Sequence, residues 1–399
     1  MRMLLKTGCG LILALILVFF CMTATGEDPD EKKDWFEQAM NAFDMQDYKT
    51  ALQYFTLLAD TGDPYAQYTT ASLYFYGWGT DQDYEKAAEY ARMSADQGIA
   101  ASQSILAHMY LNGLGVEQDI AKAAALNQFA ADGGDAQAQT ALGWMYDNGI
   151  GVEHDYEKAK EYYQLAADQG EPSAQVSMGG IYFAGLVVEQ NYEKAAEYYQ
   201  LAADQGDANG QLNLGWMYEN GFGVEQDYEQ AAEYYQLSAN QGNPDAQTNL
   251  GVLYEDGTGV PQSYETAAAY YQLAADQNFA RAQAWLAQLY EFGDGVEQSN
   301  EKAFQYYQLA AQQGDSIGQW GMGKAYQFGV GVEVDYVKAA EYYQLSADQE
   351  DPDGLECLGY LYLEGLGVEQ SLEKAIELYK LAAERGSAEA QRQLLILGQ

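Results

Sequence analysis

A tyrosine recurs at a fixed interval of 36 residues along this chain of 399 residues, and this regularity restricts the fold more than any other feature. One series keeps the interval without a break, and a second keeps it with three substitutions, Ile120, Asn300 and Leu372. A period of this length without insertions is typical of a solenoid of stacked units and not of a globular enzyme domain. The unbroken series is Tyr74, Tyr110, Tyr146, Tyr182, Tyr218, Tyr254, Tyr290, Tyr326 and Tyr362, and the second is Tyr48, Tyr84, Tyr156, Tyr192, Tyr228, Tyr264 and Tyr336.

Each repeat has the pattern of two amphipathic helices, as the unit from 137 to 170 illustrates. Its apolar residues fall at steps of three and four in each half of the unit. Between the halves, Gly149 and Gly151 accept the positive φ that ends the first helix, and Asp155 is placed to cap the second helix. The equivalent positions all carry good N-cap residues: Asp47, Asp83, Asp119, Asp155, Asn191, Asp227, Ser263, Ser299, Asp335 and Ser371. The sequence therefore predicts an all-α solenoid of about 20 helices in helix-turn-helix repeats.

The repeat A-x-x-x-L-G-x-x-Y-x-x-G-x-G-V-x-x-D-x-x-K-A-x-x-Y-Y-x-x-A-A-x-Q-G resembles the SEL-like repeat, a relative of the tetratricopeptide repeat. The resemblance covers nine full units, with partial units at each end, and it implies a right-handed α/α superhelix that serves mainly as a protein-interaction scaffold. Departures are few. Val187 replaces the second loop glycine, Thr80 the loop valine, and Gln230 and Thr266 the lysine after the cap.

The N-terminal segment differs from the repeats in having the pattern of a secretory signal. Arg2 and Lys6 precede an apolar run over 11–21, and small residues follow it over 24–26. A retained membrane anchor, which needs about 20 apolar residues, and a lipid-modified Cys21 are the alternatives. We expect an exported protein of the bacterial periplasm or cell envelope, with membrane contact only through an uncleaved signal. The segments are a signal peptide (1–26), a flexible charged tether (27–33), an atypical N-terminal repeat (34–63), nine SEL-like repeats (64–387) and a C-terminal capping helix (388–399).

The charge of the chain is strongly acidic, with 60 Asp and Glu against 19 Lys and Arg and a formal net charge of −41. Such a balance argues against nucleic acids and anionic lipid surfaces as partners. It is compatible with a basic protein partner or with a solvated acidic coat. Many of the acids also lie in helix caps and first turns, where the helix dipole favours them.

Catalytic, cofactor and metal sites are not predicted. His108 and His154 are the only histidines, and no His or Cys has metal-ligand spacing. Some SEL-like repeat proteins have been associated with β-lactam hydrolysis, and the S-x-x-K pattern occurs at 299–302 and at 371–374. Both matches fall on the N-cap column, so capping explains them. After removal of the signal Cys357 is the one remaining cysteine, which excludes an intrachain disulfide.

Positions that vary between repeats lie at steps of four, three and four in the first helix, which places them on one helix face. In tetratricopeptide-like solenoids the first helices line the concave surface, so the resemblance implies that this face is the inner wall. Aromatic residues beside Asn and Asp are typical of interaction hot spots. The alternative is that these positions vary only because they are exposed to solvent and are under no packing constraint. The candidate partner-binding residues are His108, Trp144, Asn148, Trp216, Asn220, Asp256, Trp285, Phe292, Phe328 and Tyr360.

The sequence thus favours an exported scaffold that binds protein partners, basic or associated with peptidoglycan, along the concave face. A cell-wall or carbohydrate binder is the alternative, because aromatics flanked by Asn and Asp suit sugars as well as peptides. A β-lactamase-like hydrolase is the third alternative.

Overall fold

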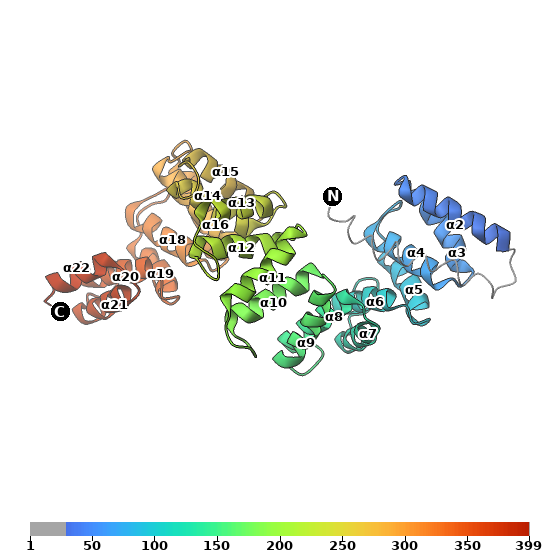
Figure 1. The fold of residues 1–399 in the computed structure, drawn as a ribbon. Coiled ribbons are helices and arrows are strands. Elements are labelled where there is room, and N and C mark those ends of the chain that lie inside the picture. The colour runs from blue at the N-terminus through green and yellow to red at the C-terminus, as the bar shows by residue number, and fades with distance from the viewer. Residues whose placement is uncertain (1–28, 399) are drawn as a thin grey trace. The chain divides into compact units, whose positions relative to one another are not determined.

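The computed structural model describes residues 29–398, which form helices joined by short loops and contain no strand. The predicted signal at 1–26 lies outside the described residues. The chain divides into two compact units, 1–210 and 211–399. Within each unit, consecutive helices pack as pairs (Figure 1). The first unit contains α2 (Pro29–Asp44), α3 (Tyr48–Asp60), α4 (Pro64–Tyr76), α5 (Tyr84–Ala95), α6 (Ala100–Asn112), α7 (Ile120–Asp132), α8 (Ala136–Asn148), α9 (Tyr156–Asp168), α10 (Pro172–Ala184) and α11 (Tyr192–Asp204).

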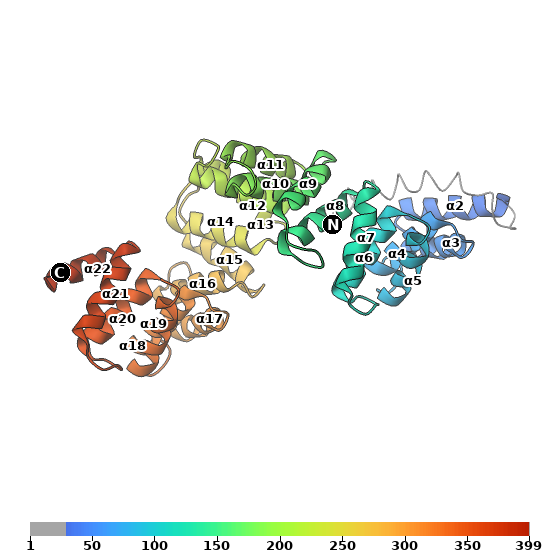
Figure 2. The same ribbon diagram turned by 90° about the horizontal axis from the view of Figure 1, so that it is seen from below.

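The second unit repeats the same helix-turn-helix arrangement (Figure 2). It contains α12 (Ala208–Asn220, from residue 211 on), α13 (Tyr228–Ala239), α14 (Pro244–Asp256), α15 (Tyr264–Ala275), α16 (Ala280–Phe292), α17 (Asn300–Gln312), α18 (Ser316–Phe328), α19 (Tyr336–Ala347), α20 (Pro352–Glu364), α21 (Leu372–Glu384) and α22 (Ala388–Ile396). The all-α solenoid that the sequence predicts is confirmed.

The predicted N-cap column is also confirmed at all ten positions. In each case the side chain accepts a hydrogen bond from a backbone N–H in the first turn of the second helix, as Asp155 does from Lys158 at 3.1 Å. The first helices end on a left-handed glycine, such as Gly149 with φ 65°. These signals are local in sequence, and they mark where each helix starts and stops.

A tyrosine of the second helix fills the centre of most repeats. From Tyr163 to Tyr379 this column is at most 7% exposed. The facing first helix usually supplies a glycine, and a Cβ added there would come within 3.1 Å or less of the ring, as Gly143 and Tyr163 illustrate. Glycine is therefore required by the close approach of the ring to the helix backbone. The column consists of Tyr163, Tyr199, Tyr235, Tyr271, Tyr307, Tyr343 and Tyr379.

Two further sets of contacts join the two helices of each repeat. Buried glutamines of the first helices accept hydrogen bonds from glutamines that end the second helices of the same repeat, as Gln139 does from Gln169 at 2.7 Å. On the other side, Tyr146 stacks on Tyr162 at 5.8 Å between ring centroids, and the ammonium of Lys158 lies 4.9 Å from the Tyr146 ring. These pairings recur with the 36-residue period, so the unbroken tyrosine series is structural in the first place.

The first helices of successive repeats lie on the inner side of each unit. Among helices that are not consecutive in sequence, the closest packing is between first helices: α6 with α8 in the first unit, and α14 with α16, α16 with α18 and α18 with α20 in the second. Elements on the inside of a curved stack approach one another more closely than those on the outside. We call the exposed side of these first helices the inner face and treat it separately in each unit.

The predicted tether at 27–33 is wrong for residues 29–33, which form the start of α2. Pro29 occupies the first helical position, and Asp30 and Glu31 lie in the first turn, where the helix dipole favours acids. Lys32 is 5% exposed, so this part of the chain packs against the first repeat. Among residues 29–398, no helix combines the length and the apolar character needed to cross a bilayer.

Candidate functional site

Nine of the ten candidate partner-binding residues are exposed on the inner face. The two tryptophans at equivalent positions, Trp144 in α8 and Trp216 in α12, are 42% and 37% exposed. Each is followed four residues later by an asparagine whose side-chain amide donates to the backbone carbonyl of the tryptophan: Asn148 to Trp144 and Asn220 to Trp216, both at 2.9 Å. The Trp216 ring also stacks on Phe222 at 5.2 Å. The two indoles are therefore presented to solvent on a rigid helix surface.

Trp285 differs from the other candidates because it is partly buried. It packs against the core cluster that contains Tyr271 and Leu286. The physical reason is its column, which faces the gap between adjacent first helices, where Gly321 is buried and Cys357 is half-buried. Trp285 is accordingly a packing residue in the first place, and it offers a partner less surface than the sequence suggests.

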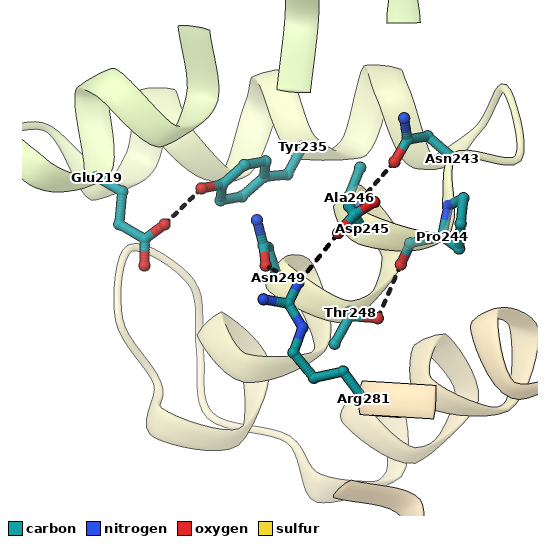
Figure 3. Close-up of polar contacts among 9 residues, drawn as sticks. All are labelled: Glu219, Tyr235, Asn243, Pro244, Asp245, Ala246, Thr248, Asn249 and Arg281. Carbon is teal, nitrogen blue, oxygen red and sulfur yellow. Dashed lines mark hydrogen bonds and ion pairs between the residues drawn. The ribbon is translucent and has the colours of Figure 1, made fainter. Parts of the chain in front are cut away.

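Carboxylates of the second unit form a row along the inner face, held by the buried tyrosines. The hydroxyl of Tyr235 donates to Glu219 (Figure 3), that of Tyr271 to Glu255 at 2.7 Å and that of Tyr307 to Glu291 at 2.9 Å. These three hydroxyls thus bind side-chain carboxylates and not water or backbone. Burial raises the pKa of the Glu255 carboxyl, and the hydrogen bond from Tyr271 partly offsets the rise.

Lys324 of α18 is bound within this row by the chain itself. Its ammonium lies 2.8 Å from Oε1 of Glu291, and 4.6 and 5.1 Å from the ring centroids of Phe292 and Trp320. A carboxylate and two aromatic rings thus surround one cation. The contact shows which chemistry this part of the inner face accepts.

Arg281 of α16 makes a second internal contact on the inner face (Figure 3). Its guanidinium donates to Oδ1 of Asn249 at 2.9 Å and lies 3.5 Å from Oδ1 of Asp245. Asp245 and Asn249 are one turn apart on α14, so Arg281 joins two adjacent first helices. Its side chain is partly exposed, and an ion pair of this kind contributes at most about 1 kcal/mol.

The serines of the two S-x-x-K patterns are helix caps. Ser299 accepts from the backbone N–H of Lys302 and Ser371 from that of Lys374, both at 3.3 Å. The Lys302 ammonium lies 4.6 Å from the centroid of the Tyr290 ring, in the same position as the other lysines of its column. Capping therefore accounts for both patterns, as the sequence indicates.

Nowhere in the described part of the chain do three or more His, Cys, Asp or Glu side chains cluster in a way that could hold a metal ion. His108 is exposed on α6, but its ring is partly desolvated, which lowers the pKa of the imidazole. Burial likewise raises the pKa of the Cys357 thiol to about 11, which keeps it protonated and unreactive at neutral pH.

Sequence reasoning missed two features. The first is the carboxylate row, whose members directly precede the candidates Asn220, Asp256 and Phe292 in sequence but were not candidates themselves. A column of apolar residues on the second helices is exposed by 39–66% and was not among the candidates either. Its members recur every 36 residues, and the signal for exposure is that an acidic residue lies four positions before or three positions after most of them, on the same helix face. They are Leu57, Met93, Phe129, Leu165, Leu201, Leu237, Leu273, Leu309, Leu345 and Leu381.

The fold and the exposed first-helix surface define an α-solenoid built from helical-hairpin repeats. A model of the Sel1 repeat matches residues 45–63, 64–99, 100–135, 136–171, 172–207, 208–243, 244–279, 280–315, 316–351 and 358–387. The chain therefore belongs to the Sel1 repeat family, whose members generally mediate protein–protein interactions.

Two solved structures show the same relationship. The chain is 34% identical to c5321, a protective antigen present in uropathogenic Escherichia coli strains that displays an SLR fold, with a TM-score of 0.69 over 91% of this chain and 79% of that chain. It is 32% identical to a Sel1 repeat protein from Oxalobacter formigenes, with a TM-score of 0.53 over 77% of this chain and 89% of that chain. Among curated proteins, no sequence matches the chain.

Proposed function

We propose that the chain is an exported scaffold that binds a protein partner on its inner face. The observation that carries the proposal is the exposure of large aromatic side chains on first helices in both units. Besides Trp144 and Trp216, Phe292 is 60% exposed, Phe328 64% and Tyr360 42%. Aromatic residues on a rigid surface contribute large contact areas at low entropic cost, which is why they dominate interaction hot spots.

For the second unit, charge complementarity favours a basic partner segment. Lys324 shows how one cation binds between Glu291 and Phe292. One repeat earlier, the positions of Lys324, Glu291 and Phe292 are held by Gln288, Glu255 and Asp256, so no lysine of the chain occupies that position. A lysine or arginine of the partner would find two carboxylates there. The net charge of −41 would also attract such a partner to the chain and repel nucleic acids from it.

The location we propose is the bacterial cell envelope, with residues 1–26 removed during export. The charged start, the apolar run and the small residues of that segment support the proposal. The relative in uropathogenic Escherichia coli is a protective antigen, which favours the same location by analogy. N-terminal sequencing of protein recovered from the envelope is expected to start near residue 27, and a start at Met1 would contradict cleavage.

Replacing Trp144 and Trp216 by alanine is expected to weaken capture of the envelope partner while helicity is unchanged. Both indoles are exposed, so their loss removes binding surface without opening a core cavity. A hot-spot tryptophan contributes about 2 kcal/mol, which corresponds to roughly 30-fold in affinity. The measurement is capture of one defined envelope protein by the wild type and by each single variant, with circular dichroism as the folding control.

Leu237→Ala serves as the matched control, since Leu237 is 48% exposed but lies on the second helix α13. Its loss should leave capture unchanged. If Leu237→Ala abolishes capture and the tryptophan variants do not, the binding surface is the apolar column of the second helices. Binding to purified cell-wall sacculi, measured in parallel, tests the carbohydrate alternative, which would be favoured if sacculi bind and no protein does.

A further inference from the structure

One repeat of the first unit lacks the tyrosine that fills the centre of the repeats after it. The column that runs from Tyr163 to Tyr379 has Asn127 of α7 one step earlier. Asparagine is much smaller than tyrosine, so a ring-sized space is left unless other side chains fill it. The repeat before that has Ala91 in the same column, and there Phe75 and Ile105 pack into the core.

The surroundings of Tyr163 show where the missing ring would lie. Tyr163 packs on Gly143, and its hydroxyl faces Asp147 and Ser177. One repeat earlier, the equivalents of these three residues are Ala107, Leu111 and Ala141. None of them is larger than leucine, so they leave the space beside Asn127 open.

A pocket of about 230 Å³ occupies this position between α4, α6 and α8, and its lining includes Leu111, Asn127 and Ala141. Sites for drug-sized ligands usually measure roughly 300–1,000 Å³, so this pocket suits a single side chain. Tyr76 and His108 also line it and are exposed, whereas Asn127 is 3% exposed. The pocket therefore opens at the inner face and has Asn127 at its base.

The carboxamide of Asn127 is poorly satisfied for a buried polar group. The one side-chain hydrogen bond that it makes in the described part of the chain runs from Nδ2 to Sδ of Met145 at 3.5 Å, and a thioether is a weak acceptor. Buried amides normally have stronger partners, because an unmet hydrogen bond in an apolar surrounding is costly. The base of the pocket can thus give or accept a hydrogen bond from a ligand.

We propose that this pocket receives a tyrosine side chain of the protein partner. The partner's ring takes the place of the tyrosine that the repeat lacks. Because it enters from the inner face and not from the second helix, its direction is reversed and its hydroxyl points to Asn127. The inference rests on the proposed function, that the inner face binds a protein. It adds that the inner face selects partners that carry a tyrosine able to enter this pocket.

The test is selection of random peptides displayed on phage against the full chain and against a filled variant. The filled variant combines Ala107→Gly with Asn127→Tyr and so reproduces the pair formed by Gly143 and Tyr163. We expect peptides selected by the wild type to share a tyrosine, to bind the filled variant at least tenfold more weakly, and to lose about three- to tenfold on replacement of that tyrosine by phenylalanine.

Ala141→Leu narrows the same pocket from α8 and is the second variant should the filled variant not fold. Ser177→Leu is its matched control, because Ser177 holds the equivalent position in a repeat whose centre Tyr163 already fills. Selected peptides without an aromatic residue, or with equal affinity for wild type and filled variant, would overturn the tyrosine anchor but leave the proposed function intact. Failure to select any peptide would count against both.

Discussion

Replacing Gly295 by alanine is expected to lower the free energy of unfolding of the second unit by about 3 kcal/mol or more. Gly295 has φ +66°, and an added Cβ would overlap the backbone carbonyl carbon and oxygen of Tyr264 at the start of α15. The clash is with backbone, so no rotamer change relieves it. The loop must move away from α15, or the two repeats must separate. Urea denaturation gives the loss, and hydrogen exchange in α15 and α16 locates it.

Gly314→Ala separates the two causes of this loss. Gly314 has φ +86°, but nothing lies within 4 Å of the Cβ position. Only the strain of a left-handed alanine then remains, which costs about 1 kcal/mol. A Gly314→Ala loss as large as that of Gly295→Ala would show that backbone conformation, and not the approach of two repeats, makes the loop glycine necessary.

Val187 provides the reciprocal comparison, because it holds the position equivalent to Gly295 in its own repeat. It keeps a positive φ of 51°, so the loop retains its left-handed turn despite a β-branched side chain. Val187→Gly is therefore expected to stabilise the first unit by about 1 kcal/mol. A loss of stability would mean that the valine side chain contributes packing that outweighs its strain.

The sequence was sufficient for the fold because its signals are local and are repeated ten times. Asp155 and its equivalents are N-caps by virtue of residue type and position alone, and the same holds for loop glycines such as Gly149. The sequence predicts a flexible tether where α2 starts, because a run of charged residues is typical of a tether. Pro29 at the first helical position and the burial of Lys32 favour a helix instead. That burial depends on tertiary contact and cannot be seen in the pattern.

The candidate surface was predictable only in part, because exposure depends on how repeats pack together. Helical spacing places Trp144 and Trp285 on one face, but only packing makes the first exposed and the second half-buried. The hydrogen bonds from Tyr271 and its equivalents to the carboxylate row cross from one helix to the other and have no local signal. The pocket at Asn127 did have a local signal, an asparagine directly before the run of tyrosines from Tyr163 to Tyr379, but only the structure shows the open space beside it.

Replacing Tyr271 by alanine is expected to cost about 4 kcal/mol of stability, since its side chain is fully buried and its ring occupies the centre of the repeat. Tyr336→Ala is the matched control. Tyr336 is 38% exposed at the start of α19, so its loss should cost about 1 kcal/mol or less. Equal losses from the two variants would contradict the assignment of the Tyr163 to Tyr379 column as the core of the repeats.

Tyr271→Phe isolates the hydroxyl, and the size of its effect should depend on pH. It keeps the ring but removes the donor to Glu255, at a cost of about 1–3 kcal/mol at neutral pH. Burial already raises the pKa of Glu255 and the Tyr271 hydrogen bond lowers it, so the variant should raise this pKa further. When the pKa of a carboxyl is higher in the folded than in the unfolded state, its contribution to the stability of the protein is lost as the pH rises through the folded-state pKa. The penalty of Tyr271→Phe should therefore be largest at neutral pH and shrink in mildly acidic buffer, and a penalty independent of pH would show that the hydroxyl does not stabilise an ionised Glu255.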